Sequence, residues 1–337
     1  RPGVPGPAGR GPDGRPAVPR NAEGTALTGD PRNDENHVLA QFQYAMLRFH
    51  NAILEWLGED CKDAFEHANR LARWHYQWIV LEEFLPAVCD PDVVEAVTSE
   101  REHYTVGPNE EPFIPVEFAG AAYRYGHSQI RERYRVNEDT EAALFGHGED
   151  AFGMGFEAAS TEDAVDWRYL FEMKDPEVTP QRARAIDPLL SPDLLDLPFV
   201  DGDDWRASLA SRNLVRGHRL GLPSGQAIAR ATGVEPLSNE ALGFDSILAD
   251  HGQHPDTEAP LWYYVLAEAR VASGGDRLGP VGSRIVAETL VGLVESDPSS
   301  FLTVQPNWTP TLPAPNTGQN DFTVADLLEF AVGDADG

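Results

Sequence analysis

Histidine is the residue type in this chain that most suggests a catalytic or metal-binding site. The stretch "AAYRYGHSQI", residues 121–130, places His127 in an aromatic-rich helical pattern, with Arg124 three positions before it. A histidine in such a place is either a buried structural residue or a metal ligand. His251 and His254 have the spacing H-x-x-H, but the polar stretch around them predicts a solvated turn. His127 is therefore the first candidate for a functional residue.

Three separated stretches carry a resemblance to a known family. They are "TGDPRNDEN" (28–36), "EFAGAAYRYGHSQI" (117–130) and "SRNLVRGHRLGLPSGQ" (211–226). In this order they resemble three segments of the animal-type haem peroxidases, in the peroxidase and cyclooxygenase superfamily, and look most like bacterial members. The resemblance covers most of residues 17–330. It implies a mainly α, multi-helix haem peroxidase fold with long loops and little or no β structure.

The resemblance gives His127 and Asn213 linked roles. His127 matches the proximal histidine, whose neutral imidazole is the fifth ligand of the haem iron. Asn213 matches the asparagine that accepts the other ring N–H of that histidine. Such a partner fixes the tautomer of the ring and makes the ligand more basic. From the residues alone, His127 could also be a core histidine, and Asn213 could cap a nearby backbone group.

Two residues of the first stretch match groups on the peroxide side of the haem. Arg32 matches the distal-side arginine, a permanently charged planar donor that stabilises negative charge on the departing oxygen as the O–O bond breaks. Glu35 matches the glutamate that forms an ester with a haem methyl in mammalian members. The residues alone leave open a turn arginine paired with Asp34 and an acidic residue in the first turn of a helix.

Two further arginines match residues near the haem propionates. Arg124 lies almost one helical turn before His127, and by resemblance it pairs with a propionate, a task suited to a guanidinium. Arg216 matches another arginine of this region. Cyclooxygenases and plant-type fatty-acid dioxygenases carry a radical-forming tyrosine at the place of Arg124, whereas Tyr123 and Tyr125 are expected to point elsewhere. This difference favours a peroxidase over a fatty-acid oxygenase.

One part of the family pattern has no match in the chain. The distal histidine, its neighbouring aspartate and the calcium-binding loop precede the arginine segment, whereas residues 1–20 here are rich in Pro, Gly and Arg. That composition predicts a flexible tail or linker. We therefore expect no calcium site of the family type, and a distal base supplied by a preceding segment or an N-terminal partner chain. The alternative is a degenerate member that binds haem poorly.

Helices must position these residues. Apolar residues at three- and four-residue steps predict an amphipathic helix over 39–57, and its expected inward residues are Leu39, Phe42, Met46, Phe49, Ile53 and Leu57. The other helices predicted from periodicity and end signals span about 61–84, 115–135, 206–218, a short stretch from 224, a stretch from 279, and 323–331. Pro86 should end the second of them, and residues 136–204 should be loop with short helices.

Composition excludes several classes of partner. The 337 residues include 55 acidic and 26 basic ones, for a net charge of −29, and such a surface should repel nucleic acid and anionic lipid. No apolar run approaches the ~20 residues that cross a bilayer, so we expect a soluble chain, secreted or cytoplasmic. After the tail over 1–20, we expect one haem peroxidase domain over 21–337.

The sequence therefore predicts a haem peroxidase, with a b-type or ester-linked haem. It would reduce hydrogen peroxide while oxidising a small organic or halide donor, and so serve the response to oxidative stress. One alternative is a haem-dependent fatty-acid dioxygenase. The other is an inactive haem-fold protein that acts as a binding or assembly subunit.

Overall fold

The chain folds into two compact units, and each unit gathers segments that are distant in the sequence. The computed structural model describes residues 18–105, 111–145, 164–174, 178–200, 204–318 and 320–332. Unit 1 comprises Arg1–Ile79, Glu132–Arg182 and Asn307–Gly337, and unit 2 comprises Val80–Arg131 and Ala183–Pro306. Most of the predicted tail over residues 1–20 lies outside the described residues.

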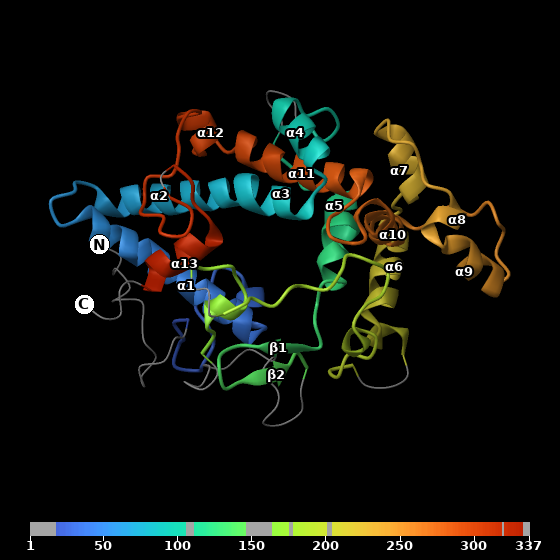
Figure 1. Ribbon diagram of the computed structural model, residues 1–337, viewed down its shortest axis with the longest axis horizontal. Coiled ribbons are helices and arrows are strands. Elements are labelled where there is room, and N and C mark those ends of the chain that lie inside the picture. The colour runs from blue at the N-terminus through green and yellow to red at the C-terminus, as the bar shows by residue number, and fades with distance from the viewer. Residues whose placement is uncertain are drawn as a thin grey trace. The chain divides into compact units, whose positions relative to one another are not determined.

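Unit 1 consists of helices and one small hairpin. Its elements are η1 (Pro31–Asp34), α1 (His37–Leu57), α2 (Ala64–Trp78), β1 (Arg133–Arg135), β2 (Glu141–Ala143), η5 (Trp167–Tyr169) and α13 (Val324–Val332). The two strands pair antiparallel, with Tyr134 opposite Ala142. Helix α1 packs against both α2 and α13 (Figure 1), so early and late parts of the described chain share one core.

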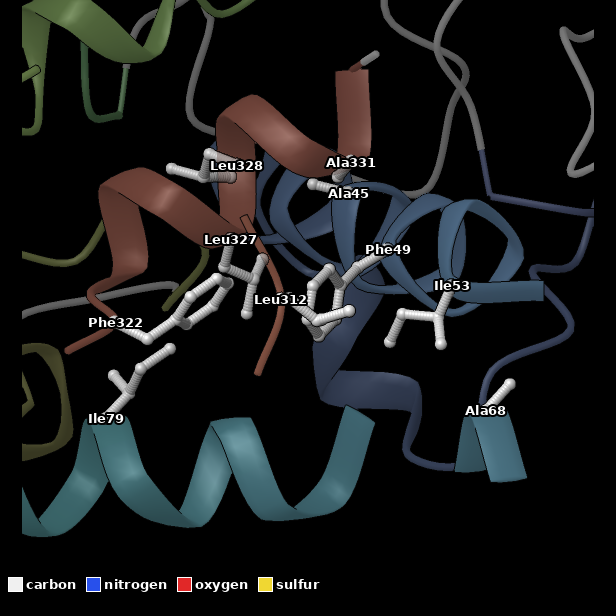
Figure 2. Packing of buried hydrophobic residues seen from close by; sticks show 10 residues of the cluster. All are labelled: Ala45, Phe49, Ile53, Ala68, Ile79, Leu312, Phe322, Leu327, Leu328 and Ala331. Atoms are coloured by element: carbon white, nitrogen blue, oxygen red, sulfur yellow. The ribbon is translucent and has the colours of Figure 1, made fainter. Parts of the chain in front are cut away.

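The helix predicted over 39–57 is confirmed, and its apolar face forms the core of unit 1. Phe49 and Ile53 are completely buried. Both belong to one cluster, in which side chains from α13 and the segment before it lie near Phe49, and Ile53 lies on the side of Ala68 (Figure 2). One residue predicted to point inward does not. Leu39 is 54% exposed. It lies in the first turn of α1, before the stretch that the core cluster includes.

The second predicted helix does not end at Pro86. After α2, the chain continues through a π-helical segment, η2 (Ile79–Phe84), into α3 (Leu85–Val88). Pro86 lies in the first turn of α3, directly after the π-helical segment. The wider π-helical turn thus replaces the break that a proline within a regular α-helix would cause.

Helix α13 begins at the predicted cap. The Asp326 carboxylate is completely buried and accepts hydrogen bonds from the backbone N and the hydroxyl of Thr323, at 3.0 and 2.8 Å. The backbone N of Asp326 donates to the Thr323 hydroxyl in return. This reciprocal arrangement satisfies donors that the helix start leaves free, and it fixes where α13 meets α1.

Unit 2 contains the remaining helices. They are α4 (Pro91–Ser99), α5 (Val116–Gly120), η3 (Ala122–His127), η6 (Pro192–Leu194), η7 (Trp205–Ala207), α6 (Leu209–Arg219), α7 (Gly225–Ala231), α8 (Asn239–Leu242), α9 (Phe244–Asp250), α10 (Leu261–Ser273), α11 (Pro280–Ser296) and α12 (Phe301–Val304). Helix α11 packs against α4 and α10 (Figure 1). Helix α10 contacts α6, α7 and η3, and so holds together the segments that carry His127 and Asn213.

Helix α10 was not predicted, although it is central to unit 2. Residues 264–269 are all buried, so its sequence lacks the alternation of apolar and polar faces on which prediction depends. One of these residues, Glu268, accepts hydrogen bonds from the backbone N of Val281 and Gly282, at 3.0 and 3.2 Å. A buried carboxylate of α10 thus caps the predicted helix α11, which begins at Pro280 as expected.

The contact between α7 and α10 leaves no room for a side chain at Gly225. A Cβ atom there would lie 1.9 Å from Cγ of Tyr264. We expect Gly225→Ala to destabilise unit 2 by about 1–3 kcal/mol, because an overpacked core must shift its backbone. Urea unfolding measures this loss. The matched control is Gly217→Ala on α6, where the new Cβ would have only ordinary contact with Leu222. Equal stability of the two variants would contradict the expectation.

Candidate functional site

His127 is the last residue of η3. The sequence predicts one helix over 115–135, and this prediction is wrong: α5 ends at Gly120, and Ala121 leaves the helical region with φ −141° and ψ −71°. A Cβ on Gly120 would lie 2.8 Å from the Leu220 side chain, so glycine permits this close packing at the end of α5. The chain then re-enters a helix of the 3-10 type, which carries the histidine.

The 3-10 geometry places Arg124 and His127 on one face. Side chains three residues apart eclipse one another in this helix. The Nε of Arg124 donates to the backbone oxygen of Ala119 at 2.8 Å, which fixes one end of its guanidinium. The indole N–H of Trp262, on α10, donates to the backbone oxygen of Arg124 at 3.3 Å. Helix α10 therefore helps to hold the segment that presents both side chains.

The structure brings His127 and Asn213 together although they are 86 positions apart. Nδ2 of Asn213 lies 2.8 Å from Nδ1 of His127, and Asn213 is 1% exposed. An amide nitrogen only donates, so Nδ1 accepts in this arrangement and the proton of the neutral ring is on Nε2. A half-turn of the amide would present its oxygen instead. The ring proton would then reside on Nδ1, and Nε2 would be free to bind a metal.

The surroundings of His127 keep its imidazole neutral. Burial, followed by the positive charges of Arg124 and Arg216, lowers the pKa of His127 to about 4. Burial and the charge of Arg216 also lower the pKa of Arg124. Arg124 is half-buried and Arg216 is exposed. The ring thus lies beside two positive charges in a chain whose overall charge is strongly negative.

A cavity of about 230 Å³ adjoins Asn213 in unit 2. Its polar wall includes Ser224 and Glu258, whose side chains share a short hydrogen bond, and its apolar wall includes Trp262. The Glu258 carboxylate also forms a 2.6 Å ion pair with Arg230. The charge of Glu258 is therefore already balanced within the protein, and the cavity has no strong net charge of its own.

Arg32 and Glu35 belong to unit 1 and are described within it. Arg32 lies on η1, with its side chain 77% exposed, and its partner is Asp30. The alternative pairing with Asp34 is not found, because Asp34 is buried and forms a 2.6 Å ion pair with Arg20. Arg32 lowers the pKa of the Asp30 carboxyl to about 2. Glu35 is exposed at the end of η1, and its charge, after that of Asp30, raises the pKa of Arg32.

The part of the chain that the structure describes shows neither a cluster of metal-binding side chains nor a membrane-spanning helix. No group of three or more His, Cys, Asp or Glu side chains there could hold a metal ion. None of the helices described combines the length and the apolar character of a membrane span. His251 and His254 are exposed, as expected for a solvated turn.

Comparison with known proteins places the chain in a family. A model of the animal haem peroxidase family matches residues 10–251. The chain therefore belongs to the animal haem peroxidase family, which confirms the resemblance found in the three stretches.

Individual relatives are distant, and the two described here are longer than the chain. Thyroid peroxidase of Canis lupus familiaris is 26% identical over 314 residues, which cover 87% of this chain and 31% of the relative. Peroxidasin of Drosophila melanogaster is 24% identical over 309 residues, or 85% of this chain and 19% of the relative. The chain thus spans about a third or less of the length of these curated relatives.

Two solved structures share the fold. Peroxidase A of Dictyostelium discoideum superposes with a TM-score of 0.62 at 18% identity, over 86% of this chain and 57% of that protein. A fatty acid alpha-dioxygenase of Oryza sativa, solved with palmitic acid, gives a TM-score of 0.56 at 15% identity, over 84% and 53%. The expected mainly helical haem peroxidase fold is confirmed.

Proposed function

We propose that the chain binds one haem through Nε2 of His127, and that the loaded protein reduces hydrogen peroxide while oxidising a small organic or halide donor. The observation that carries the proposal is the His127 and Asn213 pair in unit 2. Bound haem, b-type or ester-linked, would supply the iron redox chemistry of peroxide reduction. Removal of peroxide would serve the response to oxidative stress.

The residues of unit 2 fit such a group. The His127 imidazole is neutral at pH 7, as an iron ligand must be. Within the described residues, its Nε2 has no hydrogen-bond partner, while Nδ1 is held by Asn213. Once the Asn213 amide makes a half-turn, its oxygen would accept the Nδ1 proton and leave Nε2 for iron. Arg124 and Arg216 supply guanidinium groups that suit the carboxylates of a haem.

Two residues of unit 1 would act at the peroxide side. The Arg32 guanidinium would donate hydrogen bonds to the oxygen on which negative charge develops, and loss of such a donor costs about 10²-fold in rate. Glu35 would offer a carboxylate for an ester with a haem methyl. The proton of peroxide also needs a base. We propose that a preceding segment or an N-terminal partner chain supplies it.

Reconstitution with haemin tests the proposal. A Soret band with the spectrum of a histidine-ligated ferric haem is the expected result for the chain, and peroxide-dependent oxidation of guaiacol or iodide is expected once a longer chain restores the peroxide-side base. Haem binding without turnover, even with the peroxide-side base restored by a longer chain, would support an inactive binding subunit instead. Absence of a Soret band would reject haem binding altogether.

A fatty-acid dioxygenase is the second candidate, because the Oryza sativa dioxygenase shares the fold. That reaction needs a tyrosine near the iron, and the place three residues before His127 holds Arg124. Tyr125 is buried, which raises the pKa of its phenol, and Tyr123 stacks on Phe118 with ring centroids 4.4 Å apart. Neither ring therefore has a place in the peroxidase proposal.

We expect Tyr123→Phe and Tyr125→Phe to keep peroxide-dependent guaiacol turnover within about twofold of the wild type, since each variant loses only a hydroxyl. The unaltered protein should consume no oxygen with palmitate. An oxygen electrode and a guaiacol assay measure both. Oxygen uptake with palmitate that disappears in either variant would instead establish the dioxygenase.

A further inference from the structure

Three Asp-x-Arg stretches of the chain fold in the same way. They are "DPR" at 30–32, "DWR" at 166–168 and "DWR" at 204–206. In each, the aspartate caps a 3-10 helix by accepting the backbone N–H of the arginine two residues later. The aspartate also forms an ion pair with that arginine side chain. The same local sequence therefore forms the same clamp at three separate places in the described part of the chain.

The clamp at Asp30 fixes one edge of the Arg32 guanidinium. Nε donates to Oδ1 of Asp30 at 2.9 Å, and Nη2 donates to Oδ2 at 2.5 Å. A guanidinium has five N–H donors in a rigid plane, so the position of one edge determines the direction of the other. Among the described residues, no group accepts a hydrogen bond from Nη1 of Arg32. This outer edge remains available to an anion.

A second ion pair anchors the turn on which the clamp is built. Asp34, the last residue of η1, is 4% exposed. Arg20 holds both of its oxygens, with Nη1 to Oδ2 at 2.8 Å and Nη2 to Oδ1 at 2.6 Å. Nη1 of Arg20 also donates to the backbone oxygen of Gly24. The backbone that carries Arg32 is thus tied to the segment before it, and only the Arg32 side chain needs the clamp.

We propose that Asp30 is the positioning residue of Arg32. By holding Nε and Nη2, it keeps the guanidinium in one orientation and leaves Nη1 free to donate to the peroxide oxygen or halide on which Arg32 is proposed to act. This inference rests on the proposed function. An exposed ion pair contributes little to folding stability, so the value of the clamp lies in orientation. Loss of a residue that orients a group of the site typically weakens its function about 10-fold or more.

Asp30→Asn separates orientation from folding. The asparagine keeps one oxygen, which can still cap the backbone N–H of Arg32, but its NH₂ group cannot accept the bond from Nη2. The matched control is Asp166→Asn, which makes the same change in the same motif of unit 1, beside Arg168. Both variants should fold with the stability of the wild type.

The clamp itself can be observed without haem. In the haem-free protein, the Nε–H signal of Arg32 should appear in ¹⁵N spectra with slow exchange, and Asp30→Asn should lose this protection while Asp166→Asn keeps it. A rapidly exchanging Arg32 Nε–H in the unaltered protein would overturn the proposal.

Sodium fluoride binding to the ferric holoprotein tests whether the clamp orients Arg32, because iron-bound fluoride accepts hydrogen bonds from nearby donors. Asp30→Asn should weaken fluoride binding and peroxide turnover about 10-fold, with an unchanged Soret band before fluoride is added. In an Arg32→Lys background, Asp30→Asn should have no further effect, since the arginine through which it acts is gone.

The fluoride measurements can also overturn the inference. Unchanged fluoride affinity in Asp30→Asn, or an equal loss in Asp166→Asn, would reject Asp30 as a positioning residue while haem binding and turnover of the wild type stand. Failure of the unaltered chain to bind haem would remove the proposed function, and the inference with it.

Discussion

His127→Gly is expected to lose haem binding and, with it, peroxide turnover. Removal of the imidazole would take away the only iron ligand proposed for the chain, and it would leave the Asn213 amide, 1% exposed, without its partner. Loss of a group that merely orients a metal ligand costs about 10–100-fold in affinity or activity. We expect loss of the ligand itself to exceed the upper end of this range. Haemin titration followed at the Soret band measures it.

Added imidazole gives the sharper result. The glycine variant leaves a space of the shape of the lost ring beside Asn213, and imidazole at millimolar concentration should restore part of the Soret band and of the turnover. His218→Gly is the matched control: His218 lies on α6, the helix of Asn213, and is exposed. Equal haem affinity of wild type and His127→Gly would reject His127 as the ligand. An equal loss in the control would point to damage of α6.

Periodicity predicted the helices that have one apolar face. Helix α1 follows this pattern, because Phe49 and Ile53 recur at a helical interval and meet the core of unit 1. Helix α10 escaped it, since burial on nearly every side removes the contrast that periodicity detects. At Gly120 and Ala121, periodicity predicted a continuous helix where the structure has a break. Tertiary packing stabilises this break, and periodicity does not detect such packing.

The candidate site was predictable only in part, for a related reason. His127 and Asn213 are 86 positions apart, and no spacing rule connects two residues across such a distance. Their association came from the resemblance to a family, and the structure then gave the distance between them. The clamp at Asp30 has a local sequence signal, an aspartate two residues before an arginine, with a proline between them.

The core of unit 1 contains a histidine that, unlike the proposed iron ligand His127, has a structural role. His75, on α2, is completely buried. Its Nδ1 donates to the backbone oxygen of Leu71 at 2.7 Å, and its Nε2 accepts from the backbone N of Thr311 and Leu312, each at 3.3 Å. A proton on Nε2 would face two N–H donors. Burial lowers the pKa of His75 to about 4, despite the bond to Leu71.

This arrangement predicts that acid destabilises the protein. Below pH 6.5 the histidine of the unfolded chain takes up a proton, whereas folded His75 stays neutral until about pH 4. The unfolded state then binds more protons, so the free energy of unfolding falls as pH falls through this window. Each pH unit corresponds to about 1.4 kcal/mol, and the contribution of His75 is therefore about 3 kcal/mol, complete near pH 4.

His75→Gln isolates this contribution. Glutamine can still accept from the 311–312 backbone, but it does not titrate, so its free energy of unfolding should fall by about 3 kcal/mol less than that of the wild type between pH 7 and pH 4. Urea unfolding of the haem-free protein across this range provides the measurement. His254→Gln, an exposed site, should keep the wild-type dependence. Parallel pH curves for wild type and His75→Gln would show that His75 becomes protonated without cost, and that the 311–312 segment yields to the new N–H.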